Sequence, residues 1–216
     1  SYYAQDGASF YAIGIPMLES VKLLKSGGME REAEELLRYY EIHGEMLIKN
    51  GLCYPPHEVK YEQSIVAPAV NYLFQLYELT GKILYLEEGK KQLAVLVLFN
   101  GHQPDFHMYE NAVRHWDGYW FGKYKNLGDT FPHYWSSLSG VAFREYEKIT
   151  GERSYGVKAE NSLRGVLSMI NSDGSASCAY VYPFMVNNVR CQYADPWAND
   201  QDWALYYYLK EGKNYD

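Results

Sequence analysis

The sequence has few cysteines, no long apolar run and no excess of basic residues, and each absence excludes a class of protein. Its three cysteines, Cys53, Cys178 and Cys191, form no CxxC pair and no even set, so they predict neither a zinc knuckle nor a disulfide framework. The longest strongly apolar run, Leu93–Phe99, is far shorter than the roughly 20 residues of a membrane helix. With a formal net charge of −7, the chain lacks the clustered Lys and Arg of a nucleic-acid-binding surface. We therefore expect no membrane segment and no nucleic-acid partner.

The length of the chain allows a sizeable core. At 216 residues it is expected to form one helical domain over residues 1–216. The start, SYYAQDG, lacks the basic and apolar regions of a signal peptide, as would any segment taken from inside a longer protein. The sequence therefore indicates no cellular compartment.

Two stretches of the chain repeat the same turn chemistry. Thr80-Gly81 and Thr150-Gly151 each follow an aromatic-Glu helix end, and a tyrosine follows shortly after each glycine. A third copy surrounds Gly212. In each copy the glycine supplies the left-handed residue that ends one helix, and the next helix begins at once. The repeat predicts antiparallel helical hairpins with tight turns.

The expected helices are of two kinds, which predicts an inner and an outer layer. Residues 29–50 follow the break at Ser26–Gly28 and carry one apolar stripe opposite several glutamates, so they predict a half-exposed outer helix. Residues 61–79 carry few charges, and residues 134–149 begin with the small residues of SSLSG, so both predict enclosed helices. We expect an all-α chain of three consecutive antiparallel hairpins and the first helix of a fourth.

Long connections lead from each outer helix to the next enclosed helix, so they are expected on one face of the molecule, here called the loop face. They run from about Gly51 to Lys60, from Gly101 to His133 and from Asn171 to Asn199, with Ser1–Gly7 beside them. All five tryptophans and five of the six histidines lie in these connections or in the next helix's first turn. Such placement is typical of a site, because a plain connection needs only polar turn residues. Within the last connection, Ser177–Tyr193 is compatible with a short two-stranded ribbon.

This alternation of enclosed and outer helices, with tight turns at one end and long loops at the other, resembles the α/α toroids of the six-hairpin glycosidase-like superfamily. The resemblance rests on the turns at Leu79–Gly81 and Ile149–Gly151 and on the segments HWDGYWFGK and GDTFPHYWS. It implies a carbohydrate-active enzyme, with the helical-toroid polysaccharide lyases as architectural relatives. No subfamily's catalytic motif matches residue by residue, so the resemblance assigns no catalytic residue. Because the expected hairpins are too few for a full toroid, we expect either self-association or a missing N-terminal half.

A glycan site needs flat aromatic side chains for the C–H faces of sugars and polar groups for their hydroxyls. The loop face offers both. The candidate substrate-binding residues are Arg114, Trp116, Trp120, His133, Tyr134, Trp135 and Trp197. For about half of the aromatic side chains, a core position under a long loop is an equally good interpretation.

The main functional prediction is a glycoside hydrolase for an oligo- or polysaccharide. Hydrolysis needs one carboxylic acid to protonate the leaving oxygen and a second carboxylate as base or nucleophile. Asp117 is the preferred candidate, because Trp116 and Tyr119 flank it and would desolvate it. Asp129 and Glu62 are further candidates, although Asp129 also suits a helix cap and Glu62 also suits a helix dipole.

A polysaccharide lyase would use the same connections differently. Arg114 or Asn188 would neutralise the carboxylate of a uronic acid. His115, His133 or Tyr134 would remove the C5 proton. This is the main alternative reaction.

Two further possibilities carry less weight. A helical scaffold that binds glycan or protein without catalysis would use the aromatic residues, but it has little need for the gathered His and Asp. A metal site is not expected, because the loop histidines match no compact ligand spacing. We therefore expect an enzyme that needs no metal and no cofactor, with a polysaccharide or oligosaccharide as its partner.

Overall fold

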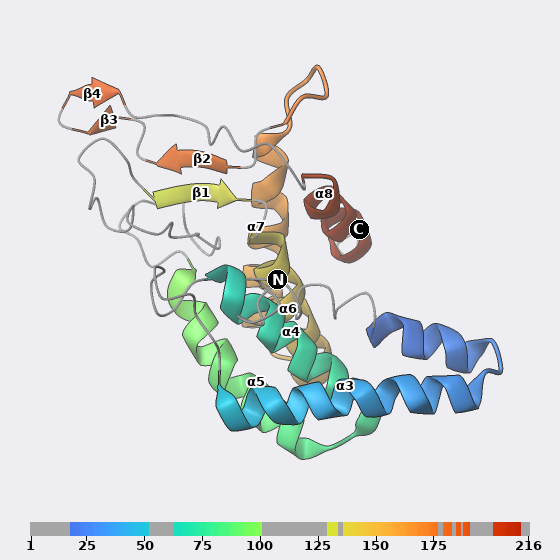
Figure 1. Ribbon diagram of the computed structural model, residues 1–216. Helices are drawn as coiled ribbons and strands as arrows, with labels where there is room; N and C mark the ends of the chain where they lie inside the picture. The colour runs from blue at the N-terminus through green and yellow to red at the C-terminus, as the bar shows by residue number, and fades with distance from the viewer. Residues whose placement is uncertain are drawn as a thin grey trace.

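The computed structural model describes residues 18–51, 63–100, 129–133, 136–176, 179–182, 185–186, 188–190 and 201–212 (Figure 1). Within them a helix over residues 18–26 precedes α3 (Glu30–Asn50), α4 (Gln63–Thr80), α5 (Ile83–Leu96), α6 (Ser136–Thr150), α7 (Arg153–Gly165) and α8 (Gln201–Glu211). Short 3-10 turns, Val97–Phe99 and Val166–Met169, extend α5 and α7. The predicted all-α fold of consecutive antiparallel hairpins, part of an α/α toroid, is confirmed. None of the helices in these ranges is long and apolar enough to cross a membrane.

The turns after α4 and α6 have the same structure, as their repeated sequence predicts. The prediction is wrong for the third copy, because Gly212 does not have a positive φ angle. Gly81 and Gly151 have positive φ angles of 68° and 75°, and each donates its N–H to the carbonyl four residues earlier at 2.7 Å. The threonine before each glycine donates its hydroxyl to the carbonyl of Leu76 or Tyr146 and accepts the N–H of the residue after the glycine. The left-handed conformation costs glycine little. Local chemistry alone therefore ends α4 and α6.

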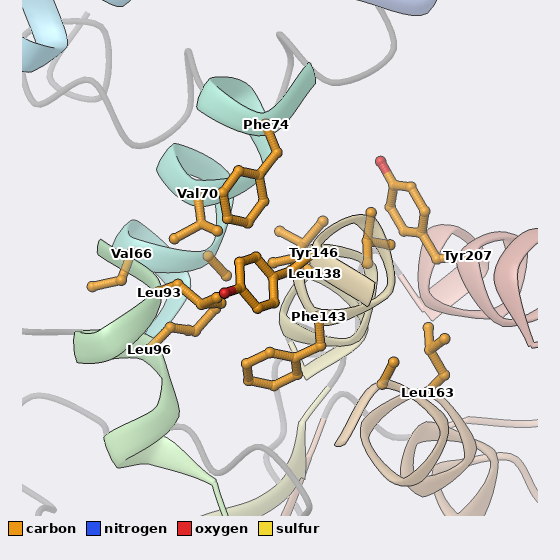
Figure 2. Close-up of a cluster of buried hydrophobic side chains, with 14 of the residues drawn as sticks. Val66, Val70, Phe74, Leu93, Leu96, Leu138, Phe143, Tyr146, Leu163 and Tyr207 are labelled. Atoms are coloured by element: carbon orange, nitrogen blue, oxygen red, sulfur yellow. The ribbon is translucent and has the colours of Figure 1, made fainter. Parts of the chain in front are cut away.

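The apolar core consists of two clusters between the inner and outer helices, and α4 takes part in both. The first cluster joins α4 to α5, α6 and α7, with Phe74 stacked on Tyr146 at a ring separation of 5.6 Å (Figure 2). The second joins α4 to α3 and the helix over residues 18–26, and in it the Tyr72 hydroxyl donates to the Tyr40 carbonyl at 2.9 Å. The buried side of α3 follows the predicted stripe, with Leu36 and Leu37 only half buried. α4 is therefore the central helix of the described part.

Glycines allow close contact where inner and outer helices cross. A Cβ atom added to Gly89 of α5 would lie 2.5 Å from the ring of Phe74. One added to Gly140 of α6 would lie 2.6 Å from Cγ of Leu163 and 3.2 Å from the carbonyl oxygen of Ala159, both on α7. One of the atoms that the added Cβ of Gly140 would meet is a backbone carbonyl oxygen, which cannot rotate away as a side chain can.

We expect Gly140→Ala to destabilise the protein by about 1–3 kcal/mol, because the added methyl group forces α6 and α7 apart. For a chain of this size each kcal/mol lowers the thermal midpoint by about 2–4 °C. The control is Gly27→Ala, where an added Cβ atom would lie 3.4 Å from its nearest neighbour in an exposed turn. Equal midpoints for the two variants would show that the crossing has room for the methyl group.

The third side of α4 is polar. Asn71, Gln75 and Glu78 follow one another at intervals of four and three residues, so they share a face that belongs to neither apolar cluster. Glu78 pairs with Lys22 of the helix over residues 18–26 at 2.6 Å. On neighbouring inner helices, Lys148 of α6 pairs with Glu211 of α8 at 2.8 Å. Lys210 of α8 also pairs with Glu19. Ion pairs therefore link the inner helices to one another near their tight-turn ends.

Glu145 of α6 lies among these charges and is only 6% exposed. Burial raises the pKa of its carboxyl above the ordinary value of 4.5, Lys148 at 3.4 Å opposes the rise, and Glu211 and Glu78 add to it. The ionised carboxylate therefore costs folding free energy. That cost is absent below about pH 4.5 and sets in as the pH rises through the folded-state pKa.

Glu145→Gln is accordingly expected to raise the thermal midpoint near pH 7 and to leave it close to the parent's at about pH 4. Lys148 keeps Glu211 as a partner in the variant. The measurement is the difference in midpoint between variant and parent across this pH range. Glu87→Gln is the control, since Glu87 pairs with Lys90 at 3.0 Å on an exposed face, where an ion pair contributes little. A variant less stable than the parent at pH 7 would mean that pairing with Lys148 outweighs the burial.

Large apolar side chains are exposed on α3, the second described helix, and on α8, the last one. Tyr39, Ile42 and Met46 form such a stripe on α3, and Tyr206 and Leu209 are exposed on α8. An open arc of hairpins leaves such flanks uncovered. The expectation of self-association or of a missing N-terminal half stays a prediction.

Candidate functional site

The loop face begins where a small antiparallel ladder joins two of the long connections. β1 (Asp129–His133), which precedes α6, pairs with β2 (Ala179–Tyr182), which follows α7. Figure 1 shows the ladder at the ends of α6 and α7 opposite their tight turn. β1 also contacts α6 and the 3-10 turn Val166–Met169. The second and third connections therefore meet on one face, as the sequence predicts.

The register of the ladder places two predicted site residues at the ends of β1. Asp129 lies opposite Tyr182, and His133 lies opposite Ala179. Between Thr130 and His133 the register shifts by one residue, at a segment that contains Pro132. Because proline has no N–H to donate to the ladder, it is found at such irregularities. The backbone of Asp129 and His133 thus belongs to the loop face, while their side chains lie outside the described part of the structure.

The other predicted site residues lie outside the described residues altogether. They are Glu62, Arg114, His115, Trp116, Asp117, Trp120, Tyr134, Trp135 and Trp197. Their roles therefore stay predictions. Among the residues that the structure does describe, no group of His, Cys, Asp or Glu could hold a metal ion.

The last connection contains two turns of defined structure. Ile170 bridges Ala176, and the turn between them is held by Asp173, whose carboxylate accepts the N–H of Ser175 at 2.9 Å and its hydroxyl at 2.6 Å. These hydrogen bonds lower the pKa of the exposed Asp173 carboxyl, because they favour its ionised form. The role of this carboxylate is therefore to hold the turn. Further on, β3 (Met185–Val186) pairs with β4 (Val189–Arg190), so this stretch does contain the short two-stranded ribbon with which its sequence is compatible.

Asn188 has a structural role in that ribbon. It is exposed and has a positive φ of 63° in the turn between β3 and β4. Asparagine tolerates this left-handed conformation better than most residues. The turn therefore accounts for the backbone conformation of Asn188, and the roles of Asn188 and Arg114 toward a uronate stay predictions.

Sequence reasoning missed a set of buried polar residues beneath the loop face. Asn71 of α4 is 0% exposed and donates its side-chain amide to the carbonyl of Leu138 in the first turn of α6 at 2.9 Å. The neighbours of Leu138 in the sequence of α6 are buried as well: Ser136, Ser137 and Ser139. The SSLSG stretch signalled an enclosed helix start, but no local pattern pointed to Asn71, since its partner is 67 residues away.

These features define a class of structure: an arc of helical hairpins, part of an α/α toroid, whose inner helices begin under a face built from long connections. No protein-family model and no curated protein sequence matches the chain. A solved structure of a polysaccharide lyase is similar to it, with 51% sequence identity and a TM-score of 0.79. The similarity covers 98% of this chain and 32% of the lyase, so the chain spans about a third of the lyase's length. The resemblance to a helical carbohydrate-active enzyme is thereby supported, whereas the six-hairpin glycosidases specifically are not.

Proposed function

We propose that this chain is part of a polysaccharide lyase that cleaves a uronic-acid glycan by β-elimination. The observation that carries the proposal is the 51% identity, over nearly the whole chain, to a polysaccharide lyase. At that identity the loop-face residues of the two proteins are expected to correspond closely. The aromatic and basic residues of the connections add support, since they suit the sugar faces and carboxylates of such a glycan.

The reaction would proceed through the groups that the sequence offers. Arg114 would pair with the uronate carboxylate, which stabilises the negative charge that develops when the C5 proton leaves. A base among His115, His133 and Tyr134 would accept that proton. The electron pair of the C5–H bond would form the C4=C5 double bond as the C4–O bond breaks, and the leaving oxygen would take up a proton. Trp116, Trp120, Trp135 and Trp197 would hold the neighbouring sugars.

The glycoside hydrolase predicted first from the sequence has no support from the similar structure. It depends on the loop carboxylates Asp117, Asp129 and Glu62, for which the elimination has no required role. Both reactions cut a glycosidic linkage, hydrolysis at its C1–O bond and elimination at its C4–O bond, but only elimination leaves an unsaturated sugar. The products therefore separate the two reactions.

The test is to incubate the protein with uronate-containing and neutral polysaccharides and to follow both near-ultraviolet absorbance and reducing ends. We expect reducing ends and absorbance to rise together on a uronate-containing glycan. Reducing ends without absorbance would establish a hydrolase and contradict the proposal. Binding without any product would indicate a glycan-binding module.

A further inference from the structure

The side chain of Asn71 makes a directional link between two inner helices that also share apolar contacts. Val66, Val70 and Phe74 of α4 pack in the first apolar cluster with Leu138 and Val141 of α6. Apolar contacts of this kind have no preferred direction, so they tolerate sliding better than a hydrogen bond does. The bond from Asn71 Nδ2 to the Leu138 carbonyl, at 2.9 Å, defines the position of α6 along α4.

The position of this bond in the fold relates it to the loop face. Leu138 is the third residue of α6, and β1 ends at His133, just before the helix begins. A shift of α6 by one residue moves its start by about 1.5 Å and carries the end of β1 with it. Such a shift would also break the bond and leave the Asn71 amide without a partner at a site with 0% exposure.

The rest of the Asn71 side chain is consistent with this role. Its Oδ1 atom is buried and accepts no hydrogen bond from the described residues. Gln75, one turn further along the same face, is 3% exposed, and within the same part of the chain its Oε1 atom has no hydrogen-bond partner. Buried amides with unused acceptors lower stability, so stability alone does not explain an asparagine at position 71.

We propose that Asn71 is a positioning residue: through Leu138 it sets the axial position of α6 and thereby places the end of β1, with the backbone of His133, on the loop face. Its effect on catalysis rests on the proposed lyase function. Its effect on β1 and α6 does not.

The test compares Asn71→Leu with Gln75→Leu by amide hydrogen exchange and by lyase kinetics. Both variants replace a buried amide on one face of α4 with leucine, but only the first removes the bond to Leu138. In Asn71→Leu we expect exchange at β1 and in the first turns of α6 to quicken roughly tenfold, with α3 unchanged. We also expect kcat to fall at least about tenfold with little change in KM, because the base is displaced while the candidate sugar-binding residues far from α6 in sequence, such as Trp116 and Trp120, remain. Gln75→Leu should match the parent in both.

An Asn71→Asp variant provides a second test. The ionised carboxylate cannot donate to the Leu138 carbonyl, whereas the protonated form can. We therefore expect the ratio of the β1 exchange rate in the variant to that in the parent, both measured at the same pH, to fall towards one as the pH is lowered.

The outcomes separate the two proposals. Faster exchange spread evenly over α3, α4 and α7, or no change at β1, would overturn the positioning role. Selective acceleration at β1 with no unsaturated product from parent or variant would support the positioning role and contradict the lyase function.

Discussion

Replacing the general base of the elimination is expected to lower kcat by roughly 10²–10⁴-fold while leaving the helical fold intact. The three variants to compare are His115→Gln, His133→Gln and Tyr134→Phe. One of them should account for most of the loss, because a single group must accept the C5 proton. Helix content by circular dichroism should stay at the parental level, since these substitutions change none of the described residues of the two apolar clusters.

Matched substitutions away from the loop face control for the loss of an imidazole or a phenol. His43→Gln changes a histidine of α3, and Tyr155→Phe changes a tyrosine of α7 next to the tight turn. Both should keep the parental kcat. If Asp117→Asn removes turnover and the three base variants retain it, the carboxylate mechanism of a hydrolase applies and the elimination is wrong.

Removing the positive charge that we propose pairs with the uronate is expected to have the second largest effect. Arg114→Ala should lower kcat/KM by roughly 10²–10³-fold, the usual loss when one group that stabilises developing negative charge is deleted. Arg114→Lys should recover part of the loss, since lysine keeps the charge but lacks the two parallel N–H donors of arginine. Steady-state kinetics on the uronate-containing glycan measures both.

Two controls accompany the arginine variants. Asn188→Gly should leave kcat/KM near the parental value, because the turn needs only a residue that adopts a positive φ. Arg38→Ala removes an arginine that lies over the Tyr39 ring on α3, and it should not affect turnover. A large loss in Asn188→Gly together with a normal Arg114→Ala would assign the uronate contact to Asn188.

The helices and tight turns were predictable because their determinants are local. The hydrogen bonds that end α4 and α6 span at most four residues, so the repeated Thr-Gly pairs are readable directly from the sequence. The apolar stripe of α3 likewise follows from the helical period. The boundaries agree to within two residues, with residues 61–79 predicted for α4 and Gln63–Thr80 observed.

The candidate site was predictable only in part. The crowding of aromatic and titratable residues into the long connections pointed to the loop face, and the ribbon in the last connection was anticipated. The pairing of β1 with β2 was not, because it joins segments about fifty residues apart and depends on where α6 and α7 end. The turn role of Asn188 was also missed, since its positive φ has no local sequence signature beyond the asparagine itself.

The sequence by itself determined where helices end, which side of each is apolar and which residue types gather on the loop face, because these properties depend on neighbours along the chain. Only the tertiary structure decided which helices meet and how closely. The Gly140 crossing with α7, the charges around Glu145 and the bond from Asn71 to Leu138 all depend on partners from other helices. Periodicity specifies a buried face but not the surface that covers it, and for that reason the alignment of α6 under the loop face could not be read from the sequence.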